Sequence, residues 1–341
     1  MKERKKWVDV ARGLSIILVV MGHAGNETIN HYLGWFRMPL FFLVSGLLFK
    51  EVPAAVYRTW AWQRIKHFMI PYFAYGICIA CLVAVRLMDP MSIPRDLRLL
   101  VYGGTVLGGW YGVFWFITCL LLVHLLMGFL TRYPLRTQAA VVALCYAAAH
   151  IVSMTPMAGW DIPWNADVAL MAIAFFFAGY VGKSVLPILL AGRQAFVPAL
   201  ALWAVAAGLN IAGRWDFRID MKLKVYTVPV VDLLLPLACV LVVLQLCYWA
   251  ARLRTTDALA FLGTVTIAIM YLHIPVNILL TYGVGLDYGT LVYTAVGVLI
   301  PLGAAWLMSK SRLLTSIFLG RQGFGRKRTK PPAPARPTTA A

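Results

Sequence analysis

Apolar segments long enough to cross a membrane recur along nearly the whole chain and are separated by short polar breaks. A hydrocarbon core of roughly 30 Å needs about 20 mostly apolar residues in a helix. The pattern predicts an all-α, polytopic integral membrane protein with about ten transmembrane helices. The predicted spans are 7–25, 34–50, 68–87, 114–130, 138–153, 167–190, 195–212, 226–250, 258–281 and 290–310.

Three segments depart from this simple pattern. Residues 101–112 are Gly-rich and too polar for a span, so we expect a re-entrant or interfacial loop there. The first span has no small-residue cleavage site after it, and we keep it in the mature protein rather than as a signal peptide. We place the transmembrane domain at 1–312. Residues 313–341 end in a basic, Pro- and Ala-rich sequence, which favours a disordered cytoplasmic tail.

Composition supports a membrane protein and excludes several other classes. Of the 341 residues, 61% are hydrophobic and 13% charged, whereas soluble domains carry about 25% charged residues. The formal net charge is +18. No aromatic-interleaved basic domain accompanies this charge, so we predict no nucleic-acid partner. Attraction to the anionic lipids of the inner leaflet explains the positive charge.

The positions of the positive charges predict the orientation. With the N-terminus in the cytoplasm, 22 of the 31 Lys and Arg residues fall inside, and both termini are cytoplasmic. One predicted outer loop is an exception, because it contains four positive charges. We favour a solvated loop here, and the alternative is a site for an anionic acceptor or a lipid head group. The four residues are Arg214, Arg218, Lys222 and Lys224.

The six cysteines all lie in apolar segments, where cysteine usually acts as a small hydrophobic side chain. Cys78 and Cys81 have the CxxC spacing, but no second pair or His ligand set accompanies them. We therefore predict no metal site.

Ionisable residues within the first predicted span are candidates for function, because burying charge in lipid is costly. Arg12 and His23 are eleven residues apart, which returns a helix to nearly the same face. Both side chains would then face one groove, about 16 Å apart along the axis. The alternative is that Arg12 extends to the inner head groups beside Asp9 while His23 is a hydrogen-bonded packing residue.

A longer motif surrounds this pair. Arg12, ten residues and His23 are followed by MPLFFLVSG at 38–46. Other marks come in order along the chain: Arg64-Ile65-Lys66 leading to Pro71-Tyr72, Phe114-Trp115-Phe116, Leu262-Gly263 and Tyr271-Leu272-His273. Over residues 5 to 310 the chain resembles the acyltransferase-3 family of membrane O-acyltransferases, including the fucose O-acetylase-like branch. Arg37 departs from the FHMPLFF of many members of that branch, so their acceptor is not carried over.

The resemblance implies a membrane O-acyltransferase of the bacterial inner membrane. It would move an acetyl or similar acyl group from cytoplasmic acyl-CoA, with acetyl-CoA as the expected donor, to a sugar hydroxyl. The acceptor would be a sugar, a lipid-linked oligosaccharide or a polysaccharide of the cell surface or the exopolysaccharide. A transporter or flippase of lipid-linked sugars is the alternative, although the two halves of the chain show no self-similarity.

The chemistry of acyl transfer suggests roles for particular residues. A sugar hydroxyl needs a base at neutral pH, and histidine has a suitable pKa, so we assign His23 as the general base. Arg37, Tyr271 or a backbone N–H could stabilise the oxyanion. Asp232 could orient His23 or pair with Arg37, and a purely structural pairing is equally open. His273 and Tyr271 are assigned to substrate binding, with helix packing as the alternative for His273.

Two further groups of residues receive predicted roles. The positive side chains on the cytoplasmic side would bind the phosphates of the donor, while the acceptor would enter from outside. Outer aromatics favour an anchoring belt over a sugar-stacking surface. His124 and His150 have no motif around them and are interpreted as structural. The donor-binding residues are Arg12, Arg58, Arg64 and Lys66; the aromatics are Trp110, Tyr111, Trp115, Trp160 and Trp164.

The predicted orientation is tested by reporter fusions. Fusions after Arg136, Arg193 and Arg254 should report the cytoplasm, and a fusion after Asp287 should report the outer compartment, because these positions fall in alternate breaks between spans. A cytoplasmic signal at Asp287 would show that the ninth predicted span does not cross the membrane.

Overall fold

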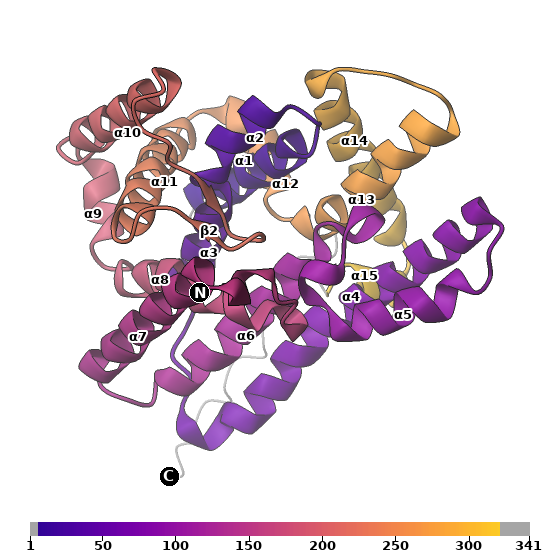
Figure 1. Ribbon diagram of the computed structural model, residues 1–341, viewed down its shortest axis with the longest axis horizontal. Helices are drawn as coiled ribbons and strands as arrows, with labels where there is room; N and C mark the ends of the chain where they lie inside the picture. Colours follow the sequence, from indigo (N-terminus) through magenta and orange to yellow (C-terminus); the bar gives the residue numbers. More distant parts are fainter. Residues whose placement is uncertain (1–5, 321–341) are drawn as a thin grey trace, which may run out of the picture.

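The computed structural model describes residues 6–320 and is almost entirely helical (Figure 1). The only strands in these residues form one short hairpin. The helices are α1 (Lys6–Gly22), α2 (Glu27–Gly34), α3 (Arg37–Leu48), α4 (Tyr57–Leu87), α5 (Ser92–Tyr102), α6 (Phe114–Leu130), α7 (Leu135–Met154), α8 (Ala166–Val181), α9 (Leu186–Ala191), α10 (Phe196–Ile211), α11 (Val231–Ala250), α12 (Asp257–Leu262), α13 (Thr266–Ile278), α14 (Thr290–Met308) and α15 (Arg312–Phe318); the strands are β1 (Ile219–Asp220) and β2 (Val225–Tyr226).

The all-helical, membrane-spanning class predicted from the sequence is confirmed, but the count of about ten spans is not. Within residues 6–320, seven helical segments are long and apolar enough to cross a membrane. The predicted spans 7–25, 34–50 and 195–212 form the shorter helices α1, α3 and α10, of 17, 12 and 16 residues. The predicted span 258–281 is divided between α12 and α13. The seven segments are 54–87, 109–130, 135–154, 163–181, 231–250, 266–283 and 290–308.

Glycines allow α3 and α8 to pack with their backbones in direct contact. A Cβ added at Gly46 would lie 1.8 Å from the carbonyl oxygen of Phe176, and one at Gly179 would lie 1.9 Å from that of Leu43. Small residues commonly permit this approach between membrane helices. The contact fixes α3, which begins at Arg37.

Helix α1 lies among α3, α11, α12, α13 and α14 and packs most closely against α12. The spaces that Cβ atoms at Gly13 and Gly263 would need are occupied by the carbonyl oxygens of Leu259 and Asp9, at 2.0 and 1.9 Å. Lys6 adds an ion pair of 2.6 Å with Asp257. These contacts give a physical reason for the Leu-Gly mark in the sequence.

The connection between α10 and α11 folds back over the bundle. Its strands pair antiparallel, with Ile219 opposite Tyr226. Lys224 forms a buried ion pair of 3.0 Å with Asp167, and Lys222 donates to the carbonyl oxygens of Leu107 and Gly112. The expectation of a solvated loop is therefore wrong for these two lysines.

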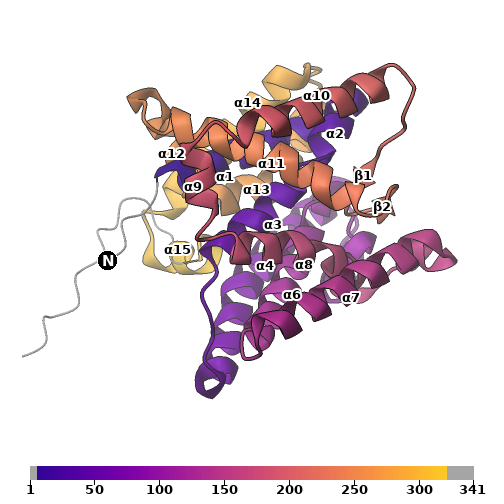
Figure 2. The ribbon, with the colours of Figure 1, turned by 90° about the vertical axis from the view of Figure 1, so that its left-hand side faces the viewer.

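The hairpin, α2 and the end of α10 lie at one end of the bundle, and α9, α12 and α15 lie at the other (Figure 2). Because α1 begins beside α12 and ends near α2, its axis runs from one end to the other. His23, immediately after α1, thus lies at the hairpin end.

Two segments predicted to lack regular structure contain short helices. Residues 101–112, predicted to be a re-entrant or interfacial loop, contain the end of α5 and two short 3₁₀ turns, Gly104–Val106 and Gly109–Tyr111. The predicted tail boundary at 313 falls inside α15, where Phe318 contacts Tyr75 of α4 with ring centroids 5.0 Å apart. Residues 321–341 of the predicted tail lie outside the described part of the chain.

Replacing Gly263 with alanine tests the α1–α12 contact. The new methyl group would meet the Asp9 carbonyl, and such overpacking costs about 1–3 kcal/mol. We expect the unfolding midpoint of the detergent-purified protein to fall by several degrees. Gly303→Ala in α14 is the matched control, because no atom lies within 4 Å of its added Cβ. Equal midpoints for the two variants would contradict the described packing.

Candidate active site

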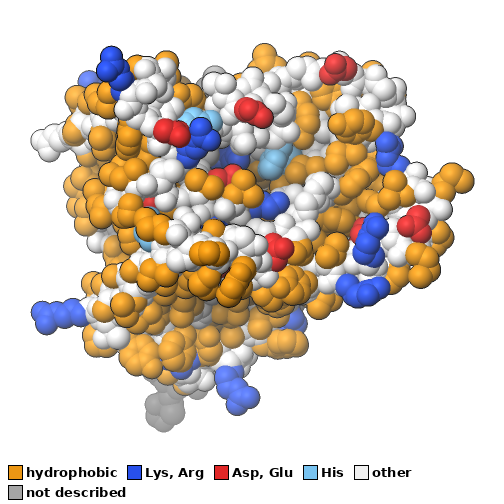
Figure 3. Space-filling view, in the orientation of Figure 1, with side chains coloured by type: hydrophobic (Ala, Val, Ile, Leu, Met, Phe, Trp, Pro, Cys, Tyr) orange, Lys and Arg blue, Asp and Glu red, His pale blue; other side chains and the backbone are white. Residues whose placement is uncertain are grey.

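A cavity of about 910 Å³ opens at the hairpin end of the bundle. In the space-filling view, charged and histidine side chains gather around a hollow in a largely hydrophobic face (Figure 3). Side chains of α1, α2, α3, α6 and the hairpin line the cavity. The lining residues include Ile16, Val19, His23, Glu27, Asn30, His31, Tyr32, Arg37, Trp115, Phe116, Asn210, Trp215, Asp216, Arg218, Asp220 and Lys222.

His23 is held at the wall of this cavity by a turn that closes α1. Its backbone N–H donates to the carbonyl oxygen of Val20 at 3.1 Å. Its ring lies against that of His273, with centroids 5.3 Å apart and planes inclined by 42°. Helices α1 and α13 thereby bring the two histidines together. From the sequence, His23 is assigned as the general base and His273 to substrate binding.

His273 is fully buried and has one ring nitrogen available. Its Nδ1 lies 2.9 Å from the carbonyl oxygen of Ile269, which can only accept, so Nδ1 donates and Nε2 is left as an acceptor. Nε2 has no hydrogen-bond partner among the described residues. An unpartnered acceptor beside His23 can help to set which nitrogen of His23 carries a proton.

Arg37 fills the space that a side chain at position 22 would occupy. Its Nη1 lies 1.4 Å from the position of a Cβ built on Gly22, so the glycine is required for this arrangement. Nη1 is buried and has no hydrogen-bond partner in residues 6–320. A buried cationic donor with free hydrogen-bonding capacity, adjacent to the residue before His23, is suited to stabilising an oxyanion.

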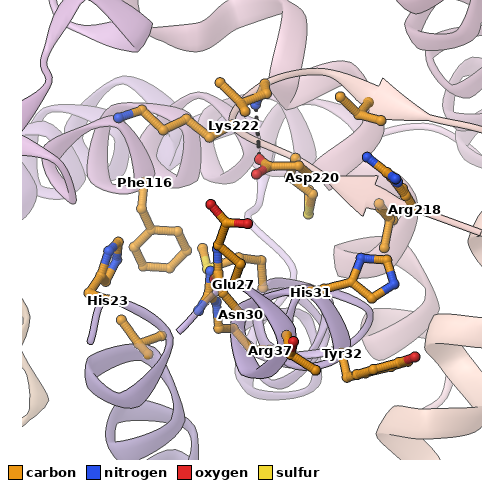
Figure 4. A pocket seen from close by; sticks show the side chains of 18 of the residues that line it. His23, Glu27, Asn30, His31, Tyr32, Arg37, Phe116, Arg218, Asp220 and Lys222 are labelled. Atoms are coloured by element: carbon orange, nitrogen blue, oxygen red, sulfur yellow. Dashed lines mark hydrogen bonds between the residues drawn. The ribbon is translucent and has the colours of Figure 1, made fainter. Parts of the chain in front are cut away.

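The outer rim of the cavity is organised around Asn210. Its Oδ1 lies 3.2 Å from Nε2 of His31 and accepts from the hydroxyl of Tyr32 at 3.0 Å. Its Nδ2 donates to the carbonyl oxygen of Trp215 at 2.9 Å. One side chain therefore ties α2, α10 and the start of the hairpin connection together. Figure 4 shows His31, Tyr32, Asp220 and Arg218 around this part of the cavity.

Arg12 lies on the face of α1 that leads toward the cavity, but not in the cavity. Ile16, Val19 and His23 line the cavity at four, seven and eleven residues beyond Arg12, the spacing of one helical face. Arg12 itself donates to the hydroxyl of Thr266 at 3.4 Å. The lined face thus stops one turn short of Arg12.

The other predicted donor-binding residues lie on α4 and are not brought together with His23. Arg64 stacks over Trp60 at 5.4 Å from the ring centroid, and Lys66 lies 5.7 Å from that of Trp62. Arg58 is exposed in the first turn of the same helix. None of the three basic residues lines the cavity.

Asp232 is placed differently from either of its predicted catalytic uses. It is fully buried, accepts from the hydroxyl of Tyr146 at 2.5 Å and lies 3.2 Å from Nε2 of His150. It does not line the cavity, and it contacts neither His23 nor Arg37 in any ion pair or hydrogen bond of the structure. The observed partners of Asp232 are therefore Tyr146 and His150, a histidine without a sequence motif.

Tyr271 also lies outside the cavity lining. Its ring stacks on Tyr75 with centroids 4.6 Å apart and meets Phe114 edge-on at 4.8 Å. Of the predicted outer aromatics, Trp115 lines the cavity, whereas Trp164 donates to the carbonyl oxygen of Val101 at 2.9 Å. The aromatic set is thus divided between the cavity and the packing around it.

Sequence reasoning missed several polar residues of the cavity. They lie in the break after His23, at the end of α10 and in the hairpin connection. Close succession to His23 was an available signal only for Glu27, Asn30 and His31. The missed residues are Glu27, Asn30, His31, Asn210, Asp216 and Asp220. Among residues 6–320 no three His, Cys, Asp or Glu side chains are placed to hold a metal ion.

Comparison with known proteins identifies the family. A family model described as "Acyltransferase domain" matches residues 5–310. Neither the search of curated proteins nor the search of solved structures found a match. The family match covers all of the elements that line the cavity, and both His23 and Arg37 lie within it. The chain is therefore a member of the acyltransferase-3 family.

Proposed function

We propose that this protein transfers an acetyl or similar acyl group from acyl-CoA to a hydroxyl of a cell-surface or exopolysaccharide sugar. The family supports acyl transfer in a membrane. The observation that carries the proposal is the cavity wall, to which both His23 and Arg37 contribute and where the unpartnered Nη1 of Arg37 lies against Gly22, the residue before His23. A base and an oxyanion donor are the two groups that acyl transfer to an alcohol requires.

In the proposed reaction His23 removes the proton from the acceptor hydroxyl. The hydroxyl oxygen attacks the thioester carbonyl, and the negative charge that develops on the carbonyl oxygen is stabilised by Arg37. The carbon–sulfur bond then breaks, and the CoA sulfur takes the proton from His23. The products are the sugar ester and free CoA, and His23 returns to its starting state.

The donor is proposed to approach along the face of α1. Its acyl end would reach His23 past Val19 and Ile16, which line the inner part of the cavity, while its phosphates remain near Arg12. The eleven-residue step from Arg12 to His23 rises about 16 Å. The acceptor would enter at the hairpin end, where the polar rim lies. The proposal thus has the donor come from the cytoplasm and the acceptor from outside, at the bacterial inner membrane.

Removing the imidazole of His23 should abolish most of the transfer. We expect His23→Ala to lower kcat by about 10²–10⁴-fold, the usual contribution of a positioned base. Acyl transfer from labelled acetyl-CoA to cell-surface polysaccharide measures the effect, with membrane abundance and the unfolding midpoint as controls. Added imidazole should restore part of the activity, which a packing role for His23 does not predict. Full activity in His23→Ala would refute the mechanism.

Arg12→Lys should weaken acyl-CoA binding about tenfold, because lysine keeps the charge but loses the planar, bidentate phosphate contact. Arg12→Ala should weaken it further. Binding of acyl-CoA to the purified proteins measures both changes. Arg98→Lys on α5 is the matched control, since this exposed arginine lies outside the cavity lining. Unchanged affinity in Arg12→Ala would remove Arg12 from the donor site.

A further inference from the structure

Most charged groups that line the cavity already have protein partners. Arg218 and Asp216 form an ion pair with 2.9 Å between Nε and Oδ1. Lys222 donates to two backbone carbonyl oxygens, at 3.1 and 3.3 Å. Asp220 accepts from the backbone N–H of Leu223 at 3.0 Å, within the hairpin turn. These groups hold the walls of the cavity in place.

Glu27 is different because its carboxylate has no such partner. Within residues 6–320 it makes no hydrogen bond and no ion pair, although it lines the cavity. The close-up shows its carboxylate pointing into the cavity, in the space between His23 and Asp220 (Figure 4). Its backbone lies in the first turn of α2, which Asn26 caps by accepting from the N–H of Ile29 at 2.9 Å.

A free carboxylate in a cavity has a defined ligand preference. Ionised, it only accepts hydrogen bonds, so it binds donors such as sugar hydroxyls. Although Glu27 is exposed, it disfavours an anionic group at the same place, because like charges repel. Aromatic side chains line the same cavity and offer surface to the apolar faces of a sugar ring; they are Tyr32, Trp115, Phe116 and Trp215.

Arg37 and Glu27 are suited to bind different substrates in the cavity. Nη1 of Arg37 is the available cationic donor beside His23, and it suits the thioester oxygen. Glu27 is the available anionic acceptor four residues after His23, and it suits hydroxyl groups of the incoming alcohol. Lys222 already donates to two backbone carbonyl oxygens, so only part of its hydrogen-bonding capacity is left for a negatively charged acceptor.

We propose that Glu27 is a specificity-determining residue that binds acceptor hydroxyls and restricts the acylated unit to an uncharged glycosyl group. The inference rests on the proposed function and extends it from "a sugar" to a class of sugar. Glu27 binds the acceptor and takes no proton in the reaction. Its loss therefore affects the KM for the acceptor more than kcat.

The test compares charged acceptors with uncharged ones. The purified protein is given saturating acetyl-CoA and one acceptor at a time. The charged acceptors are methyl glucuronoside and methyl galacturonoside; the uncharged ones are the methyl esters of these two uronic acids, methyl hexosides and methyl 6-deoxyhexosides. The wild type should acylate the uncharged glycosides at least tenfold more efficiently than the uronates. Glu27→Gln should raise the acceptor KM about tenfold, leave the KM for acetyl-CoA unchanged and reduce the discrimination between each uronate and its ester.

Glu51→Gln is the matched control, because Glu51 accepts from the Tyr180 hydroxyl at 3.0 Å and does not line the cavity. It should behave as the wild type. Equal use of uronates and esters by the wild type, or unchanged discrimination in Glu27→Gln, overturns the role of Glu27 alone. Binding of neutral glycosides without any transfer overturns the proposed function and preserves the role of Glu27. Neither binding nor transfer with any glycoside overturns both.

Discussion

The contact between Arg37 and Gly22 is the constraint on which the rest of the site depends. A guanidinium is costly to bury, and this one is accommodated because residue 22 has no side chain and because Asp220 of the hairpin provides an opposing charge. Any larger residue at position 22 would displace Arg37 and disturb the turn that carries His23. The end of α1 and the start of α3 are consequently tied together where the cavity begins.

The hairpin connection provides the outer half of the same site. Burial lowers the pKa of Lys222, while the nearby Asp220 acts to raise it. The Lys222 ammonium donates to two backbone carbonyl groups. The Lys224–Asp167 ion pair holds the base of the hairpin against α8. With Asn210 joining α2 and α10, the rim is fixed by polar contacts, while Nη1 of Arg37 and Oδ1 of Asn30 are buried without a hydrogen-bond partner among the described residues.

Local patterns in the sequence predicted the helices and the His23 face of the cavity, because both depend on apolar length and helical periodicity. Asp232 was not predictable, because its partner His150 is 82 residues away and becomes a neighbour only when α7 packs near α11. Glu27 looks like an ordinary surface residue in the sequence and Asn210 lies near the end of a predicted span, and both become part of the cavity only through the tertiary fold. The count of about ten spans was not confirmed, and hydropathy does not show where a helix ends: α3 stops after 12 residues.

The central claim is that His23 acts as a base in a direct transfer between two bound substrates. Incubating the purified protein with acyl-labelled acetyl-CoA and no acceptor measures this most directly, because a covalent intermediate would trap the label on the protein. Direct transfer predicts that no label remains on the denatured protein. Stoichiometric labelling that disappears in His23→Ala would instead show an acyl-histidine intermediate and contradict the account.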